Sequence, residues 1–164
     1  MVIGVDPGPV KSALCMWDGK IPFYPKYSEN HDILDDLSNL YHTKKEAILA
    51  VERPVCQKWA GAEVSDTAIE AGRFLGVWGH DEQYLINRSK IRWHIGKVKQ
   101  TNDSIIRQAL IDRIHPDYDR LYNPGVLIGI TGDIWQALAV AVTCCDLLEK
   151  GETDGLIGIH KKTT

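Results

Sequence analysis

MVIGVDPGPVKSALCMWDG, residues 1–19, contains two short apolar runs that are separated by a turn. The first run, residues 1–6, is rich in β-branched side chains and ends at a Pro-Gly-Pro sequence, and the second, residues 10–17, ends at an Asp-Gly pair. Strand-like runs bounded by proline and glycine in this way are typical of a β-hairpin. The chain is therefore expected to begin with two antiparallel strands.

The rest of the chain alternates between helical and strand-like hydrophobic patterns. Apolar residues recur with helical spacing in residues 31–41, 63–78, 103–114 and 133–148. Strand-like runs occupy residues 21–27, 47–52 and 84–87, and residues 53–62 and 117–131 are expected to be loops. Together these elements predict an α/β fold with a mixed five-stranded sheet flanked by helices. One domain over residues 1–150 is expected, followed by a polar tail over residues 151–164.

Composition agrees with a single globular domain, because 44% of the 164 residues are hydrophobic and 25% are charged. No apolar run is long enough to span a membrane, and no secretory signal opens the chain, so a cytoplasmic protein is expected. The four cysteines lack CxxC spacing, and two of them are adjacent. This pattern disfavours a disulfide framework or a zinc site, and the cysteines are expected to be reduced core residues.

Charge is distributed unevenly along the chain. Residues 86–115 contain seven basic and two acidic side chains, a net of +5, whereas the whole chain carries −3. This separation indicates either a nucleic-acid binding stripe on an acidic body or a solvated charged face.

Three carboxylates lie where apolar elements end or begin: Asp6 and Glu52 close strands, and Asp133 opens the last helix. Neighbouring parallel strands bring such ends together. Clustered carboxylates need a compensating cation, and their oxygen atoms favour magnesium, with manganese as a substitute. Each carboxylate also has a structural explanation: a turn at Asp6, an ion pair of Glu52 with Arg53 or another base at a sheet edge, and helix capping at Asp133 together with Gln136.

Five segments together resemble the RuvC family of Holliday junction resolvases. Residues 3–8 (IGVDPG) are similar to the family's IGIDPG opening, residues 51–52 (VE) to its strand-ending IE, and residues 133–141 (DIWQALAVA) to its DAADALAIA helix. Residues 66–72 (DTAIEAG) and 97–100 (KVKQ) resemble segments that the family has in the same order. The opening motif alone is shared with actin-like sugar kinases, whereas the ordered set is specific and covers residues 1–149.

The resemblance implies a ribonuclease-H-like fold, a homodimer, and paired cuts in four-way or other branched DNA by metal-dependent hydrolysis. Asp6, Glu52 and Asp133 would be metal ligands and catalytic residues. Gln136 stands where the family motif has a second aspartate, so it would be a neutral ligand that lowers metal affinity. The compact chain without a long basic tail resembles phage-type members, which would act in the host cytoplasm.

The resemblance also implies DNA-contacting residues. Lys97 and Lys99 match basic positions near the scissile phosphate, where either would offset charge in the transition state. Trp59, in a loop that is longer than the family's usual connection, would stack on an unpaired base. Lys90, Arg92 and Arg107 are assigned to phosphate contacts, which position DNA without reading its sequence.

Two other functions remain open. Gln136 is compatible with a junction-binding protein that cleaves weakly or not at all, which restoring Asp at this position would test. The strand and turn at Asp6 would also suit an ATP-binding domain of the actin and sugar-kinase type, although the chain lacks a second lobe.

Overall fold

The computed structural model describes residues 1–54, 61–79, 82–97, 102–152 and 154–158. The elements in chain order are β1 (Val2–Asp6), β2 (Lys11–Trp17), β3 (Pro22–Glu29), α1 (Asn30–Thr43), β4 (Ile48–Arg53), α2 (Ala62–Trp78), β5 (Gln83–Asn87), α3 (Arg88–Gly96), α4 (Asp103–Ile114), the short 3₁₀ helix η1 (Gly125–Leu127), α5 (Ile134–Glu149) and β6 (Leu156–Gly158).

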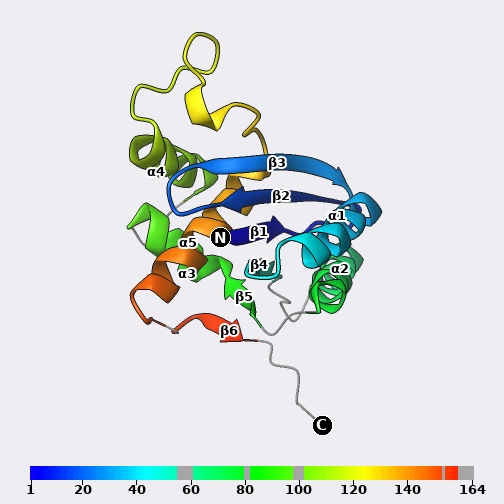
Figure 1. Ribbon diagram of the computed structural model, residues 1–164. Coiled ribbons are helices and arrows are strands. Elements are labelled where there is room, and N and C mark those ends of the chain that lie inside the picture. The colour runs from blue at the N-terminus through cyan, green and yellow to red at the C-terminus, as the bar shows by residue number, and fades with distance from the viewer. Residues whose placement is uncertain (55–60, 80–81, 98–101, 153, 159–164) are drawn as a thin grey trace.

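The strands form one mixed sheet in the order β3-β2-β1-β4-β5-β6 (Figure 1). β1, β2 and β3 are joined as antiparallel neighbours, so the predicted hairpin at the start of the chain is confirmed. β4 and β5 run parallel to β1, and β6 returns antiparallel to β5. The carboxyl ends of β1, β4 and β5 therefore lie at the same edge of the sheet.

Helices cover both faces of the sheet (Figure 1). On one face, α1 and α2 bury a core cluster that includes Ile3, Leu37 and Phe74. On the other face, α3, α4 and α5 bury a second cluster against the alternate residues of the strands. Because side chains of successive strand residues point to opposite faces, the nearly continuous apolar runs of β1 and β4 serve both clusters.

Helix α5 crosses β1 at very close range. A Cβ atom built on Gly4 would lie 2.1 Å from the carbonyl oxygen of Ala137 and 2.8 Å from the amide nitrogen of Ala141. The absence of a side chain at Gly4 thus allows the helix backbone to rest directly on the strand. The amino end of α5 lies about one helical turn before Ala137, so this crossing fixes its position relative to the end of β1.

Two features differ from the sequence prediction. The sheet has a sixth strand, because residues 156–158, expected to be part of a polar tail, pair with β5. Helix α3 was not predicted, although Ile91, His94 and Ile95 form its buried side. Among the described residues, no helix is both long and apolar enough to cross a membrane.

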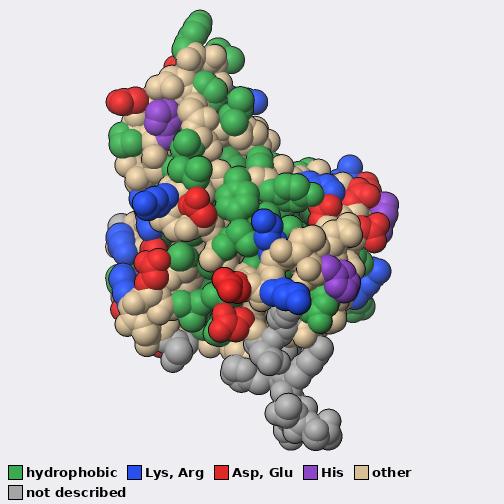
Figure 2. Space-filling model, viewed as in Figure 1, with side chains coloured by type: hydrophobic (Ala, Val, Ile, Leu, Met, Phe, Trp, Pro, Cys, Tyr) green, Lys and Arg blue, Asp and Glu red, His purple; other side chains and the backbone are tan. Residues whose placement is uncertain are grey.

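Residues 115–131 form a lobe that projects beyond the sheet, at the top of Figure 1. Figure 2 shows hydrophobic side chains at its tip, where Leu121 and Tyr122 are exposed. Leu127 and Ile130, by contrast, are buried in the same core as α5. The lobe is therefore anchored to the domain at its base.

Candidate active site

The carboxyl ends of two parallel strands bring Asp6 and Glu52 together. β1 and β4 are paired with Val5 opposite Val51, so Asp6 and Glu52, the next residue of each strand, lie side by side at this edge of the sheet. A cavity of about 240 Å³ opens onto both carboxyl groups. This is the edge at which α/β sheets of this kind hold their ligands.

The turn after Asp6 is held by a buried polar network. The amide of Gly8 donates to Ser12 Oγ at 3.1 Å, and Ser12 Oγ donates to Asn30 Oδ1 at 2.6 Å. Asn30 Nδ2 then donates to the carbonyl oxygen of Gly8 at 3.1 Å. Because these bonds close a ring between β2, α1 and the turn, the backbone that carries Asp6 is fixed.

The two carboxyl groups occupy an environment that disfavours two negative charges. Burial raises the pKa of Asp6 to about 8, and the charge of the adjacent Glu52 adds to the rise, while Arg88 opposes it. Burial also raises the pKa of Glu52, again against the effect of Arg88. Glu52 Oε2 is buried and has no hydrogen-bond partner within the described ranges. An additional cation would relieve both costs.

The amino end of α5 supplies the other two predicted residues. Asp133 is the N-cap of the helix, is exposed, and makes no side-chain capping bond, unlike the capping explanation considered from sequence. Its charge raises the pKa of Asp6, but less than Glu52 does. Gln136 is 6% exposed and lies one turn further along the helix. Within the described part of the chain, no three His, Cys, Asp or Glu side chains converge closely enough to hold a metal ion by themselves.

Arg88 joins the site, which the sequence analysis did not anticipate. It is the first residue of α3, directly after β5, and its Nη1 donates to Glu52 Oε1 at 2.8 Å. Its Nη2 donates to Asp103 Oδ1, at the start of α4, at 3.0 Å. Glu52 therefore pairs with Arg88, a base at the sheet edge other than Arg53. The sequence feature that could have predicted this role is the position of Arg88 directly after the third parallel strand.

The predicted DNA-contacting residues are dispersed. Lys90 reaches Asp154 at 3.6 Å, and Arg92 reaches Asp103 at 3.6 Å. Lys97 is exposed at the end of α3 with a left-handed backbone. Trp59 and Lys99 lie outside the described residues.

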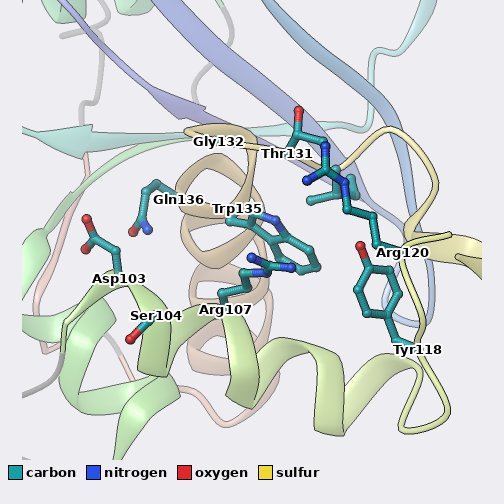
Figure 3. A pocket seen from close by; sticks show the side chains of 10 residues that line it. Asp103, Ser104, Arg107, Tyr118, Arg120, Thr131, Gly132, Trp135 and Gln136 are labelled. Atoms are coloured by element: carbon teal, nitrogen blue, oxygen red, sulfur yellow. The ribbon is translucent and has the colours of Figure 1, made fainter.

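Arg107 lines a second cavity, of about 280 Å³ (Figure 3). Its walls come from α4, the lobe at residues 115–131 and the amino end of α5. Asp103 and Gln136 belong to this wall, so the cavity continues from the Glu52–Arg88–Asp103 chain of contacts.

Two solved structures share this architecture. Thermus thermophilus RuvC in complex with a Holliday junction substrate aligns with a TM-score of 0.65 and 14% identity over 92% of this chain and 96% of its own. A second Thermus thermophilus RuvC structure aligns with a TM-score of 0.66 and 14% identity over 96% and 99% of the two chains. No protein-family model matches the sequence, and no curated protein matches it in sequence. The chain thus has a RuvC-like, ribonuclease-H-like α/β fold, as the sequence predicted.

Proposed function

We propose that the protein is a metal-dependent endonuclease that resolves four-way DNA junctions and also cuts other branched DNA. On this proposal it acts as a homodimer and is a phage-type enzyme. The observation that carries this proposal is the pairing of a partly buried Asp6 with a buried Glu52 at the carboxyl edge of a sheet with RuvC-like topology. Support for junction DNA as the substrate comes from the similar RuvC that was solved with a Holliday junction substrate.

The donor set at the pair suits Mg²⁺, with Mn²⁺ as a substitute. Magnesium in enzymes that act on phosphates is commonly held by one or two carboxylates together with the substrate phosphate and water, without a complete protein cage. Asp6 and Glu52 would supply the two carboxylates, and the unpartnered Glu52 Oε2 offers a free ligand atom. Asp133 and Gln136 would complete the site from α5. Bound magnesium would supply Lewis-acid charge for phosphodiester hydrolysis.

The protein groups around the pair would orient it. Arg88 holds Glu52 Oε1 and leaves Oε2 free, so the carboxylate has one defined rotation. The same guanidinium ties Glu52 to Asp103 and hence fixes α4 against the sheet edge. Lys97, exposed at the end of α3, and the neighbouring Lys99 would offset charge on the scissile phosphate.

The proposal is tested by incubating a labelled four-way junction and a matched linear duplex with Mg²⁺ or Mn²⁺. We expect symmetric nicks near the crossover of the junction, and none when Asp6→Asn replaces the wild-type protein. Asp35→Asn, which removes an exposed carboxylate of α1, is the matched control and should cut normally. Equal cutting of junction and duplex, or full activity of Asp6→Asn, would contradict the proposal.

A second candidate function is junction binding with weak cleavage. It is favoured by Gln136, a neutral and buried side chain on the first turn of α5, whose N-cap is Asp133. On this view the wild-type protein binds the junction tightly and cuts it slowly, because one negative ligand is missing.

The proposed dimer would form through α2. Ile69 on this helix is 60% exposed, and Gly72 and Gly76 have open space where side chains would stand. A groove lined by Ala68, Gly72 and Leu75 runs along the same helix. Static light scattering should give twice the mass of one chain, and Ile69→Lys should shift the mass toward that of one chain.

A further inference from the structure

We propose that the cavity between α4, the lobe at residues 115–131 and the amino end of α5 binds a backbone phosphate of the DNA strand that enters the active site. The proposal rests on the proposed nuclease function for the identity of the polymer, and on the cavity itself for the phosphate. Figure 3 shows the guanidinium groups of Arg107 and Arg120 on either side of the Trp135 indole. Both arginines line the cavity together with the hydroxyl-bearing Ser104 and Thr131.

Trp135 is a rigid platform for the first guanidinium. Trp135, the second residue of α5, is 4% exposed and belongs to the core cluster on that face of the sheet. Arg107 lies over its ring at 5.6 Å from the centroid, and Tyr118 meets it edge to face with centroids 6.3 Å apart. A cation held on an aromatic face keeps its outward N–H groups available for another partner. Arg107 is thus fixed before any ligand binds.

A tight turn fixes the backbone that carries the second arginine. Asp119 Oδ1 accepts from the amides of Leu121 at 2.8 Å and Tyr122 at 2.9 Å, and the backbone of Asp119 is paired in both directions with that of Asn123. Arg120 lies inside this turn, so its backbone is fixed although its side chain is exposed. The otherwise irregular lobe therefore has a defined shape where it faces the cavity.

The charge balance of the cavity favours an anion. Neither Arg107 nor Arg120 forms a salt bridge with a described residue, whereas Arg88 and Arg113 each do. The acidic group of the wall, Asp103, already faces two other guanidinium groups, those of Arg88 and Arg92. Two like charges at one cavity without a counter-charge are stabilised by a bound phosphate, which guanidinium groups bind in a charge-assisted way.

The position of the cavity points to a phosphate of the strand being cut. Asp103 joins the cavity wall to Glu52, because Arg88 donates to both carboxylates. Gln136 of the same wall lies on the first turn of α5, whose N-cap is Asp133. A strand whose scissile phosphate lies at Asp6 and Glu52 would continue past these residues. A neighbouring phosphate would then meet Arg107 and Arg120.

The test compares DNA affinity at several salt concentrations for the wild type, Arg120→Gln and Arg107→Gln. The probes are a fluorescent four-way junction and a single-stranded oligonucleotide, both in EDTA so that no cleavage occurs. Loss of one phosphate contact lowers the slope of log affinity against log salt by about 0.9 for duplex and about 0.7 for single strands. We expect this change, with about tenfold weaker binding at low salt, for each variant. Lys45→Gln, an exposed cation at the opposite end of the sheet, is the matched control and should leave the slope unchanged.

The outcomes separate this inference from the proposed function. Unchanged slopes for both variants, in a protein that cleaves junctions, would overturn the cavity assignment and leave the nuclease in place. Reduced slopes in a protein that never cleaves junctions would support the cavity and contradict the nuclease. No binding of either DNA by the wild type would overturn both. Arg107 packs on Trp135, so thermal unfolding shows whether Arg107→Gln disturbs the fold. If it does, the result for Arg120→Gln decides, because the Arg120 side chain is exposed.

Discussion

Replacing Gly4 with alanine should push α5 away from β1 and disturb both the core and the active site. The new Cβ would lie 2.1 Å from the carbonyl oxygen of Ala137 and 2.8 Å from the amide nitrogen of Ala141. Non-bonded heavy atoms ordinarily lie about 3.5 Å or more apart, so the helix must retreat by about 1.4 Å at Ala137. Both contacts are with backbone atoms, and no side-chain rotation relieves them. Overpacking costs about 1–3 kcal/mol, and more where backbone must move, so we expect a loss of about 3 kcal/mol in the free energy of unfolding.

Urea unfolding followed by tryptophan fluorescence measures this loss, because Trp17 and Trp78 are fully buried. Gly76→Ala on α2 is the matched control: a Cβ there has nothing within 4 Å, and the change should stabilise the helix. The expected gain is about 0.5–1 kcal/mol. It is measured at a protein concentration at which light scattering gives the mass of one chain, because the proposed dimer would form through α2. Junction cleavage by folded Gly4→Ala should also fall, since Asp133 and Gln136 move with the helix. A Gly4→Ala protein within about 0.5 kcal/mol of the wild type would show that the close crossing is not a constraint.

Three further changes follow from the contacts of the site and the core. Arg88→Gln should abolish most cleavage and cost about 2 kcal/mol of stability, because Glu52 loses its charged donor in a buried setting. Burial alone would raise the pKa of Asp146, but hydrogen bonds, the strongest from Arg113, hold that pKa well below its usual value. Asp146→Asn should therefore destabilise the protein at neutral pH, and the difference from the wild type should shrink as pH falls below about 4, where the unfolded carboxyl group protonates. Gln136→Asp should raise the turnover of the metal-loaded enzyme, because it adds a negative ligand.

Each of these changes has a control or a result that would contradict it. Lys11→Gln breaks an ion pair with Glu29 in which both side chains are exposed, and it should alter stability by less than about 0.5 kcal/mol, in contrast to Arg88→Gln. A constant gap between the urea midpoints of wild type and Asp146→Asn from neutral to acidic pH would contradict the depressed pKa. No gain in turnover for Gln136→Asp would count against the weak-cleavage alternative.

The central elements of the fold could be predicted because their hydrophobic patterns are unambiguous. The hairpin, the buried strand that ends at Glu52 and the apolar last helix all match the structure closely. β6 was missed because a strand of three residues in a polar segment carries no usable period. α3 was missed because its apolar stripe is short and lies among basic residues, which the charge pattern assigned to DNA binding.

Only those residues of the candidate site that lie at strand ends could be predicted from the sequence. Asp6 and Glu52 adjoin because parallel strands end at one edge, and this follows from sequence order alone. Arg88 and Asp103 meet there through the packing of α3 and α4, which no local pattern encodes. The cavity at Arg120 depends on a lobe whose shape comes from turn hydrogen bonds rather than from hydrophobic periodicity.

The next measurement is the product distribution from a supercoiled plasmid that extrudes a cruciform, incubated with the wild-type protein and Mg²⁺. A dimer that makes paired cuts across the junction should linearise the plasmid early in the reaction, and Asp6→Asn should leave it supercoiled. Nicked circles without early linear product would contradict paired resolution by a dimer. An unchanged plasmid with wild-type protein and either metal would contradict the nuclease assignment itself.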